Sequence, residues 1–296
     1  MDVSDLRMFG VMARLGGMGR AASELNTVQS NVSAHIRRLE TDLGVTLFAR
    51  EPRGVALTPA GERLVPFAAA LDRLLADAAR AVRDDGRPQG RLVLGTLETT
   101  AALRLPEVVA GFVAAYPEVD LTLRTGTSCE LVAQVAAGDV EGAFVCGPVA
   151  DPDLVAETVL EEELVLLSAP GCRSLAEALG TAGLRIVVLR TGCSYRERLE
   201  RFLAGQGLPA PRVMEFGTLE AVMSCVAAGL GVTMLPRALL GPVWQKGRVA
   251  MHAVPPRDAR VETQFVRRRD AYVSAALAAF LAMARERHGA GIRPAA

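Results

Sequence analysis

The sequence predicts a mixed α/β protein in three parts: a small helical domain ending in a β-hairpin, a long connecting helix, and a two-lobed α/β domain. Short amphipathic segments up to about residue 43 are followed by turn-forming residues at Pro52 and Gly54. Between residues 59 and 82, apolar residues recur every three or four positions, which is typical of one long helix. After Arg91, apolar runs typical of buried strands alternate with helical segments. The 296 residues are enough for more than one domain.

The composition favours a cytoplasmic globular protein that needs no metal and no cofactor. Half of the residues are hydrophobic, but no apolar run is long enough to cross a bilayer, so we expect no membrane contact. Residues 1–7 carry acids and lack the apolar region of a signal peptide. Five cysteines and three histidines are scattered without C-x-x-C spacing, which argues against disulfides and zinc. A net charge of zero does not exclude nucleic acid, because one small basic face is enough to bind it.

Two short helices are expected at the start of the chain. Ser4 is a suitable N-cap for a first helix that runs to about Leu15. A glycine pair at positions 16 and 17 ends this helix. The second helix, residues 20–25, carries Ala21 and Ala22, which are small enough for close helix packing.

The third helix is expected from Val28 to about residue 43, with Thr27 as its N-cap. Its apolar positions recur every three or four residues and define a buried face. They are Val32, Ile36, Leu39 and Leu43.

The opposite face of this helix carries small polar and basic side chains. They are Gln29, Ser30, Asn31, Ser33, His35 and Arg37. Amides of Gln and Asn pair with adenine, and Arg pairs with guanine or phosphate, so this face suits the DNA major groove. An ordinary solvated helix face is the alternative interpretation. The short helix before it and the hairpin after it favour DNA.

A two-stranded wing is predicted at residues 45–57. Arg50 and Arg53 flank its turn at Pro52 and Gly54. At this place they are within reach of backbone phosphates, although a surface hairpin with solvated arginines is the alternative.

The first sixty residues resemble the winged helix-turn-helix signature of LysR-type transcriptional regulators. The matching residues are Ala21, Ala22, Leu25, Gln29, Ser33, Ile36, Leu39, Glu40, Leu43, Gly44, Leu47, Phe48, Arg50, Leu57, Thr58 and Gly61. The chain departs from the pattern at Ser30, where the family usually has proline, and at Ala34, where arginine is common. The resemblance implies a regulator that binds double-stranded DNA, with residues 1–58 as the DNA-binding domain.

The connecting helix is expected over residues 59–88, with Thr58 as cap and Pro59 in its first turn. Its apolar seam is Leu64, Phe67, Leu71, Leu74 and Ala78. Such a seam favours a partner helix, although packing on its own domain is an alternative. The resemblance implies that subunits pair through this helix as homodimers or homotetramers. A symmetric dimer reads a palindromic operator, and RNA polymerase is a further candidate partner.

The α/β domain is expected over residues 91–296. Strands are predicted at 92–95, 119–123, 142–146, 155–160, 164–168, 186–189, 213–216, 232–235, 249–253 and 261–266, and helices at 103–115, 131–137, 195–204, 219–228 and 275–287. The last helix is expected to pack against the first half of this domain. That arrangement gives one lobe of residues 91–162 plus 267–296 and another of residues 163–266. The resemblance implies a similarity to periplasmic binding proteins, with a small-molecule effector between the lobes.

Three predicted strands end in small hydroxyl or thiol residues before a helix. The candidate effector-binding residues are Thr96, Thr99, Thr100, Thr125, Thr127, Ser128, Cys193 and Ser194. Hydroxyls and free N–H groups at helix starts suit a small anion, most simply a carboxylate metabolite. Ordinary N-capping explains each of them singly. Arg196 and Tyr195 add a charge and a hydroxyl at the cleft if they do not simply face solvent. Two charged triplets, residues 161–163 and 267–269, fall between the lobes and are expected mainly on the solvated surface, with salt bridges between the lobes as the alternative.

The main functional prediction is therefore a DNA-binding regulator that responds to an effector. An alternative input is oxidation of Cys193, because a helix start and the nearby Arg196 lower a thiol pKa. An enzyme is the third interpretation, but the sequence has no G-x-S-x-G, P-loop or H-E-x-x-H motif, so we expect no catalytic residue.

Overall fold

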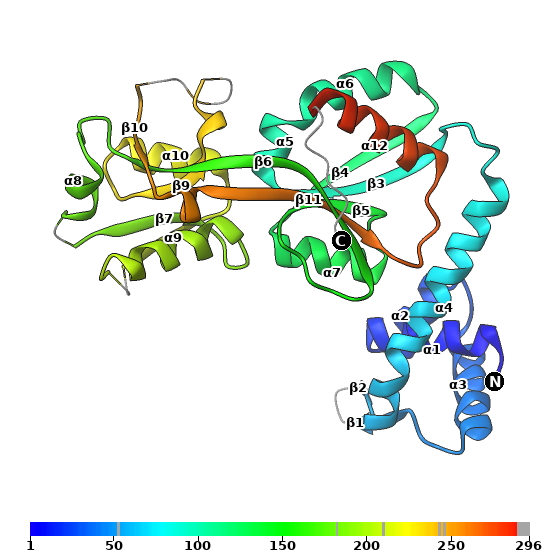
Figure 1. Ribbon diagram of the computed structural model, residues 1–296. Coiled ribbons are helices and arrows are strands. Elements are labelled where there is room, and N and C mark those ends of the chain that lie inside the picture. Colours follow the sequence, from blue (N-terminus) through cyan, green and yellow to red (C-terminus); the bar gives the residue numbers. More distant parts are fainter. Residues whose placement is uncertain (52–53, 182, 209–210, 242–243, 245–246, 289–296) are drawn as a thin grey trace. The chain divides into compact units, whose positions relative to one another are not determined.

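The computed structural model describes residues 1–51, 54–181, 183–208, 211–241, 244 and 247–288. The chain separates into two compact units, residues 1–85 and 86–296, and each is described by itself (Figure 1). No helix of the described residues is long and apolar enough to cross a membrane.

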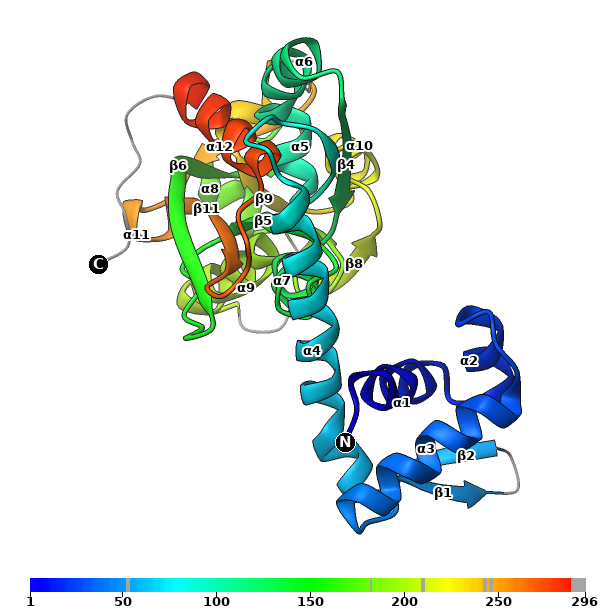
Figure 2. The same ribbon diagram turned by 90° about the vertical axis from the view of Figure 1, so that its right-hand side faces the viewer.

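The first unit is a helical domain with a hairpin and a long helix. Its elements are α1 (Val3–Leu15), α2 (Met18–Glu24), α3 (Gln29–Leu43), β1 (Phe48–Glu51), β2 (Gly54–Leu57) and α4 (Pro59–Arg83). Helix α1 packs on α2, α3 and the middle of α4, where Arg7 pairs with Asp72 at 3.3 Å (Figure 2). Phe9, Met12, Val32 and Leu39 are fully buried at the centre of this core. The helices and the antiparallel β1–β2 wing follow the predicted order.

The helix caps of this unit differ in detail from the prediction. Asp2, not Ser4, caps α1, because its Oδ1 accepts a hydrogen bond from the Ser4 N–H at 2.7 Å. Val28 occupies the N-cap of α3, since the Thr27 hydroxyl instead accepts from the Asn31 side chain at 3.0 Å. Leu43, predicted on the buried face, is exposed in the last turn of α3.

Hydrogen bonds fix the wing to the helices on both sides of it. Glu40 of α3 accepts from the N–H of Leu47 at 2.7 Å. Thr58 caps α4 by accepting from the Gly61 N–H at 3.1 Å, and its hydroxyl donates to the Thr46 carbonyl at 2.7 Å. The predicted start of the long helix is therefore confirmed, and the same threonine fastens that start to the wing.

The second unit begins with a sheet whose first strands are parallel. Strand β3 (Gly90–Thr96) lies between β4 (Val119–Thr125) and β5 (Gly142–Cys146). Helices α6 (Leu105–Ala115) and α12 (Ala275–His288) cover one face, where Phe112 and Phe280 make an edge-to-face contact at 5.1 Å. Helix α7 (Ser128–Ala137) covers the other face. Leu92 and Val93 belong to different cores because neighbouring strand residues point to opposite faces.

Two long strands continue from this first lobe into a second one. Strand β6 (Leu154–Ser168) pairs with β11 (Arg260–Arg268) in its first part, then with β9 (Thr233–Pro236) and β10 (Ala250–Ala253). An Ile186–Val232 bridge connects β9 to β7 (Arg185–Leu189), which pairs in parallel with β8 (Arg212–Phe216). The remaining elements are α5 (Glu98–Leu103), α8 (Leu175–Leu179), α9 (Ser194–Gly205), α10 (Leu219–Ala227), a 3-10 turn (Arg237–Leu239) and α11 (Pro256–Ala259).

Two predictions for the connection between the lobes are wrong. The strands expected at 155–160 and 164–168 are one strand, β6, because residues 161–163 keep pairing with β11. Glu162 therefore lies inside a strand and is buried, although the acidic triplet was expected on the surface. Arg268 is buried as well, and its Nε donates to Asp270 at 2.8 Å. Strand alternation is the cause: Glu161 and Glu163 remain exposed while the residue between them points inward.

Candidate functional site

The N-terminal part of α3 displays most of the side chains predicted to read DNA. Gln29, Ser30, Asn31 and Arg37 are exposed, and Ser33 is half-buried. Arg37 donates to the Ser33 hydroxyl at 2.8 Å, one turn away on the same helix. Among the described residues no side chain caps α3, so its first N–H groups are open to an incoming acceptor such as a phosphate oxygen.

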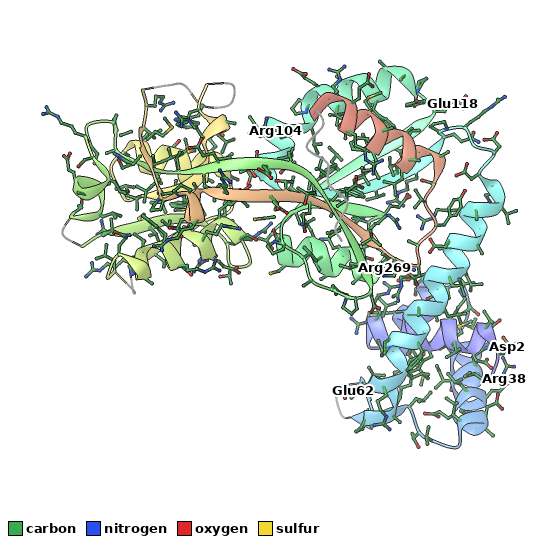
Figure 3. All side chains as sticks on the ribbon, viewed as in Figure 1. Asp2, Arg38, Glu62, Arg104, Glu118 and Arg269 are labelled. Carbon is green, nitrogen blue, oxygen red and sulfur yellow. The ribbon has the colours of Figure 1, made fainter. Side chains whose placement is uncertain are left out.

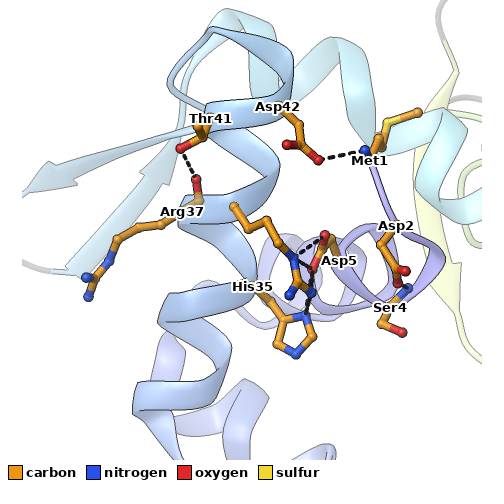
Figure 4. A network of polar contacts seen from close by, with 9 residues as sticks. Met1, Asp2, Ser4, Asp5, His35, Arg37, Thr41 and Asp42 are labelled. Carbon is orange, nitrogen blue, oxygen red and sulfur yellow. Dashed lines mark hydrogen bonds and ion pairs between the residues drawn. The ribbon is translucent and has the colours of Figure 1, made fainter.

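His35 does not point outward with these residues. Its Nδ1 lies 2.6 Å from Oδ1 of Asp5, a fully buried carboxylate of α1, and Arg38 also binds this carboxylate (Figure 4). These partners, with Arg38 first, hold the pKa of the Asp5 carboxyl below its ordinary value, against the effect of burial. His35 thus connects α3 to α1, because the turn of the helix at this position directs the ring toward Asp5.

The side chains of the two wing arginines lie outside the described residues. Arg50 belongs to β1, but its side chain is outside the described residues, and so is all of Arg53. Their contact with phosphates stays a prediction.

The predicted seam of α4 is divided between the core and the surface. Leu64 packs against the core of the first unit, and Leu71 is half-buried. Phe67 is 69% exposed, Leu74 is 64% exposed, and Ala78 is also exposed. These three residues form a stripe, which we call the α4 stripe, because they lie seven and four positions apart on one helix face.

A cavity of about 300 Å³ lies between the two lobes of the second unit. Six of the eight predicted effector residues line it, namely Thr99, Thr125, Thr127, Ser128, Cys193 and Ser194. Thr96 and Thr100 are buried beside it and are not among its lining residues. Tyr195, whose hydroxyl the sequence suggested for the cleft, also lines it, whereas Arg196 does not. The lining residues that the sequence did not indicate include Leu97, Glu98, Gly126, Cys146, Leu189, Arg190, Gly217 and Thr218.

Helices from both lobes begin at this cavity. Thr127 caps α7 in a reciprocal capping box with Glu130, and Thr218 caps α10 by accepting from the Ala221 N–H at 3.3 Å. Helix α9 begins after Cys193, and no side chain of the described residues caps it. Helix α5, whose first residues Glu98 and Thr99 also line the cavity, has no side-chain cap either, so α5 and α9 both leave their first N–H groups open where they begin at the cavity.

Hydrogen bonds cross the cavity from one lobe to the other. The hydroxyls of Ser128 and Ser194 are 3.0 Å apart, and the Ser128 hydroxyl also accepts from the Cys146 N–H at 3.2 Å. Glu98 accepts from the N–H of Leu219 at 2.9 Å. The sequence signal for Glu98 was its position three residues after the strand predicted at 92–95, where α5 begins five residues before the helix predicted from 103.

A buried carboxylate lies behind the cavity wall. Glu162 accepts from Arg104 at 3.2 Å, from the Tyr195 hydroxyl at 3.4 Å and from the Thr263 hydroxyl at 3.4 Å (Arg104 is labelled in Figure 3). The Tyr195 hydroxyl also accepts from Thr99, at 3.5 Å. Burial is the main reason that the pKa of Tyr195 lies well above its ordinary value, so the phenol keeps its proton.

The pKa of the Cys193 thiol is raised, whereas the sequence predicted that it would be lowered. Its side chain is 8% exposed, and burial raises the pKa of the thiol, although the nearby N–H groups of Arg196 and Tyr195 act in the opposite direction. Arg196 is paired instead with Glu200 at 2.9 Å and Glu215 at 2.6 Å. The loss of water around the sulfur therefore outweighs the helix start.

Two family models match the chain. Residues 3–62 match the model described as bacterial regulatory helix-turn-helix protein, lysR family. Residues 85–289 match the model described as LysR substrate binding domain.

Similar proteins and structures cover nearly the whole chain. The HTH-type transcriptional regulator GltR of Bacillus subtilis (strain 168) is 39% identical over 286 residues, 97% of either chain. The HTH-type transcriptional regulator CzcR of Bacillus anthracis is 35% identical over 288 residues, 97% of this chain and 98% of that protein.

Among solved structures, a full-length OxyR variant from Pseudomonas aeruginosa has a TM-score of 0.68 at 21% identity and covers 97% of this chain and 94% of its own. Full-length CbnR complexed with the target DNA has a TM-score of 0.64 at 21% identity and covers 98% of this chain and 100% of its own. At these identities the two structures support the fold.

Proposed function

Because this chain belongs to the LysR family of bacterial transcriptional regulators, we propose that α3 reads a palindromic operator and that a small carboxylate effector controls this binding. Family membership makes the chain a DNA-binding transcriptional regulator and not an enzyme.

Operator reading is assigned to the exposed side chains at the start of α3. Gln29 and Asn31 carry amides that pair with base edges, while Arg37 and the open N–H groups of α3 suit guanine or phosphate. Ser30 and Ser33 are included as smaller polar contacts. His35 is assigned to holding α3 against α1, because its ring is bound to Asp5.

Pairing of subunits is assigned to the α4 stripe. A residue as large and apolar as Phe67 at 69% exposure is costly to leave in water, and a second copy of α4 would cover it. Two subunits related by a twofold axis present two α3 helices, which calls for two half-sites in the operator.

Effector binding is assigned to the cavity between the lobes. The observation that carries this assignment is the uncapped start of α9 beside the Ser128–Ser194 pair, since N–H groups and hydroxyls from both lobes converge there. An anion bound to both lobes stabilises the arrangement in which they approach each other. It can shift operator binding only if it binds that arrangement better than others.

The DNA assignment is tested with fragmented genomic DNA of the source organism. Fragments retained by the purified protein at physiological salt are sequenced, and we expect an enriched inverted repeat. The double variant Gln29→Ala and Asn31→Ala should lose this enrichment. Arg37→Ala, which removes a proposed phosphate contact, should bind all fragments more weakly and with a smaller salt dependence. Ala76→Ser, at an exposed position of α4, is the control that keeps the reading face. Retention of random sequence by the unaltered protein would contradict the assignment.

The effector assignment is tested by the melting temperature of the full-length protein with small carboxylates and, in parallel, with the corresponding amines. A cleft-bound carboxylate should raise the melting temperature of the wild type and do less for Ser194→Ala. Ser224→Ala, a serine of α10 away from the cavity lining, is the control. The redox alternative predicts instead that peroxide consumes the Cys193 thiol and changes operator binding, and its raised pKa argues against this outcome.

A further inference from the structure

A second cavity, of about 300 Å³, lies next to the proposed effector cavity and shares Glu98 with it. It lies between α5 of one lobe and α10 of the other, and we call it the α5–α10 cavity. Helix α5 also contacts the 3-10 turn Arg237–Leu239 there. The volume is at the lower end of the range for small-molecule sites, so the two lobes leave room for a second small ligand.

Apolar side chains form most of the wall of the α5–α10 cavity. Leu219, Met223 and Leu239 are buried, and the half-buried Trp244 is the single tryptophan of the chain. Arg248 stacks on the indole ring, 4.8 Å from its centroid, but it is not among the lining residues. This wall suits a ligand with an apolar body.

Two carboxylates, those of Glu98 and Glu220, give the same wall a negative charge. Each acid lies in the first turn of its helix, and a helix start contributes only about half a positive charge. Glu98 accepts from the N–H of Leu219 at 2.9 Å, and neither acid forms an ion pair within the part of the chain that the structure describes. None of the described lining residues is basic. A cationic donor is therefore the ligand group that these carboxylates favour.

The indole N–H of Trp244 is a donor without an acceptor. Its Nε1 is buried and has no hydrogen-bond partner among the described residues. An unpaired buried N–H is costly, and a ligand oxygen that accepts from it recovers this cost. An ammonium cannot do so, because it has no lone pair. The wall thus calls for an oxygen acceptor in addition to a cation.

We propose that the α5–α10 cavity is a second ligand site, which binds a small amine with an apolar body and an oxygen acceptor. The ammonium meets Glu98 and Glu220, the oxygen accepts from Trp244, and the body lies against the buried apolar side chains. This site does not depend on the proposed carboxylate effector, and a ligand in it contacts both lobes.

Fluorescence of the single tryptophan tests the proposal, because Trp244 lines the α5–α10 cavity and not the proposed effector cavity. Three compounds are titrated into the full-length protein, with excitation at the red edge of the indole absorption. They are tyramine, 2-phenylethylamine, which lacks the phenol oxygen, and tyrosol, which has a hydroxyl in place of the ammonium.

Tyramine should change the emission of Trp244 and saturate. Tyrosol should bind at least about tenfold more weakly, because it loses the hydrogen bonds to charged carboxylates. 2-Phenylethylamine should bind several-fold more weakly than tyramine, since it leaves the indole N–H unpaired. Equal binding of tyramine and tyrosol, or no change in emission with any of the three, would overturn the proposal. Equal binding of the two amines would refute the indole contact.

Glu220→Gln tests where the ammonium lies. This exposed acid should be replaceable without a change in the melting temperature of the ligand-free protein. Its loss should weaken tyramine several-fold and leave tyrosol unchanged. Glu197→Gln, an exposed acid in the first turn of α9 that lines neither cavity, is the matched control and should keep the preference for tyramine.

Ser194→Ala separates this site from the proposed effector site, because Ser194 lines only the effector cavity. The variant should bind tyramine as the wild type does. Tyramine binding that is lost in Ser194→Ala and kept in Glu220→Gln would place the amine in the effector cavity and overturn the proposal. Failure of carboxylates alone to bind would count against the proposed effector and not against the amine site.

Discussion

At the scale of single residues, two buried carboxylates organise the candidate sites. Asp5 is fully buried and binds Arg38 and His35 of α3, while Glu162 binds Arg104 and two hydroxyls behind the cavity. Neither acid was identified as important from its sequence context. Each lies on a regular element at a position where the periodicity turns it inward, and each has partners from distant segments.

Asp5→Asn should destabilise the first unit by about 2 kcal/mol at neutral pH, because the amide cannot replace the charged hydrogen bonds to Arg38. The folded-state pKa of Asp5 is lowered, so its stabilisation is present above the unfolded pKa of about 4 and is lost as the pH falls through the folded pKa. Hydrogen exchange of α1 and α3 at several pH values should show the difference between wild type and variant shrinking below about pH 4. Asp42→Asn, which removes the exposed pair with the N-terminal ammonium, should cost well under about 1 kcal/mol. An equal loss of stability in the two variants would contradict the conclusion that the buried Asp5 carboxylate contributes more than the exposed Asp42 carboxylate.

At the scale of elements, the wing and the long helix depend on one close approach. A Cβ at Gly61, in the first turn of α4, would lie 2.3 Å from the Leu47 carbonyl oxygen and 2.9 Å from a Leu57 methyl group. The helix start can therefore contact the wing only if this residue has no side chain. The capping bond from Gly61 to Thr58 keeps the same turn in place.

Gly61→Ala should consequently lower the stability of the first unit by at least about 1–3 kcal/mol, the usual cost of overpacking, because the obstacle is backbone. Gly10→Ala is a matched control within the same unit, since its Cβ would meet the Ala68 methyl at an ordinary 3.5 Å. That substitution should be neutral or stabilising by up to about 1 kcal/mol, as alanine favours a helix over glycine. Thermal unfolding followed by circular dichroism distinguishes the two, and equal melting temperatures would disprove the close approach.

The α4 stripe makes a prediction about assembly. Leu74→Asp places a charge in the proposed helix pair, where burial without a partner is strongly unfavourable, and should convert the oligomer to monomers at micromolar concentration. Ala76→Asp adds the same charge to an exposed position on another face of α4 and should leave the oligomer intact. Sedimentation velocity measures both. A wild type that sediments as a monomer, or a Leu74→Asp variant that remains an oligomer, would refute the pairing.

At the scale of the whole molecule, effector control requires that the lobes of the second unit change their separation. The Ser128 and Ser194 oxygens lie 3.0 Å apart across the cavity, and a disulfide between cysteines at these positions needs a sulfur separation of about 2.05 Å. Oxidised Ser128→Cys with Ser194→Cys should therefore hold the lobes together without ligand. Its operator affinity should shift in the direction that the effector shifts the wild type.

Reduction of the same sample is the first control for this lock, because it should restore the ligand-free affinity. Ser194→Cys alone is the second control, and mass spectrometry identifies the bonded cysteines. An oxidised double variant with the affinity of the ligand-free protein would show that lobe approach does not control DNA binding.

Local signals in the sequence determined the elements of this protein and the family to which it belongs. The period of apolar residues indicated the helices of the first unit, Thr58 and Pro59 indicated the start of α4, and the apolar run at Gly142–Cys146 indicated β5 with the bounds observed. Only the tertiary structure decided that β6 runs unbroken between the lobes, that His35 turns toward Asp5, that Glu98 lines the cavity, and that Glu162 is buried behind it in contact with Tyr195. The reason is physical: caps and periodicity act between residues a few positions apart, whereas burial of a carboxylate and the direction of a hydroxyl proton depend on partners that the fold brings from far along the chain.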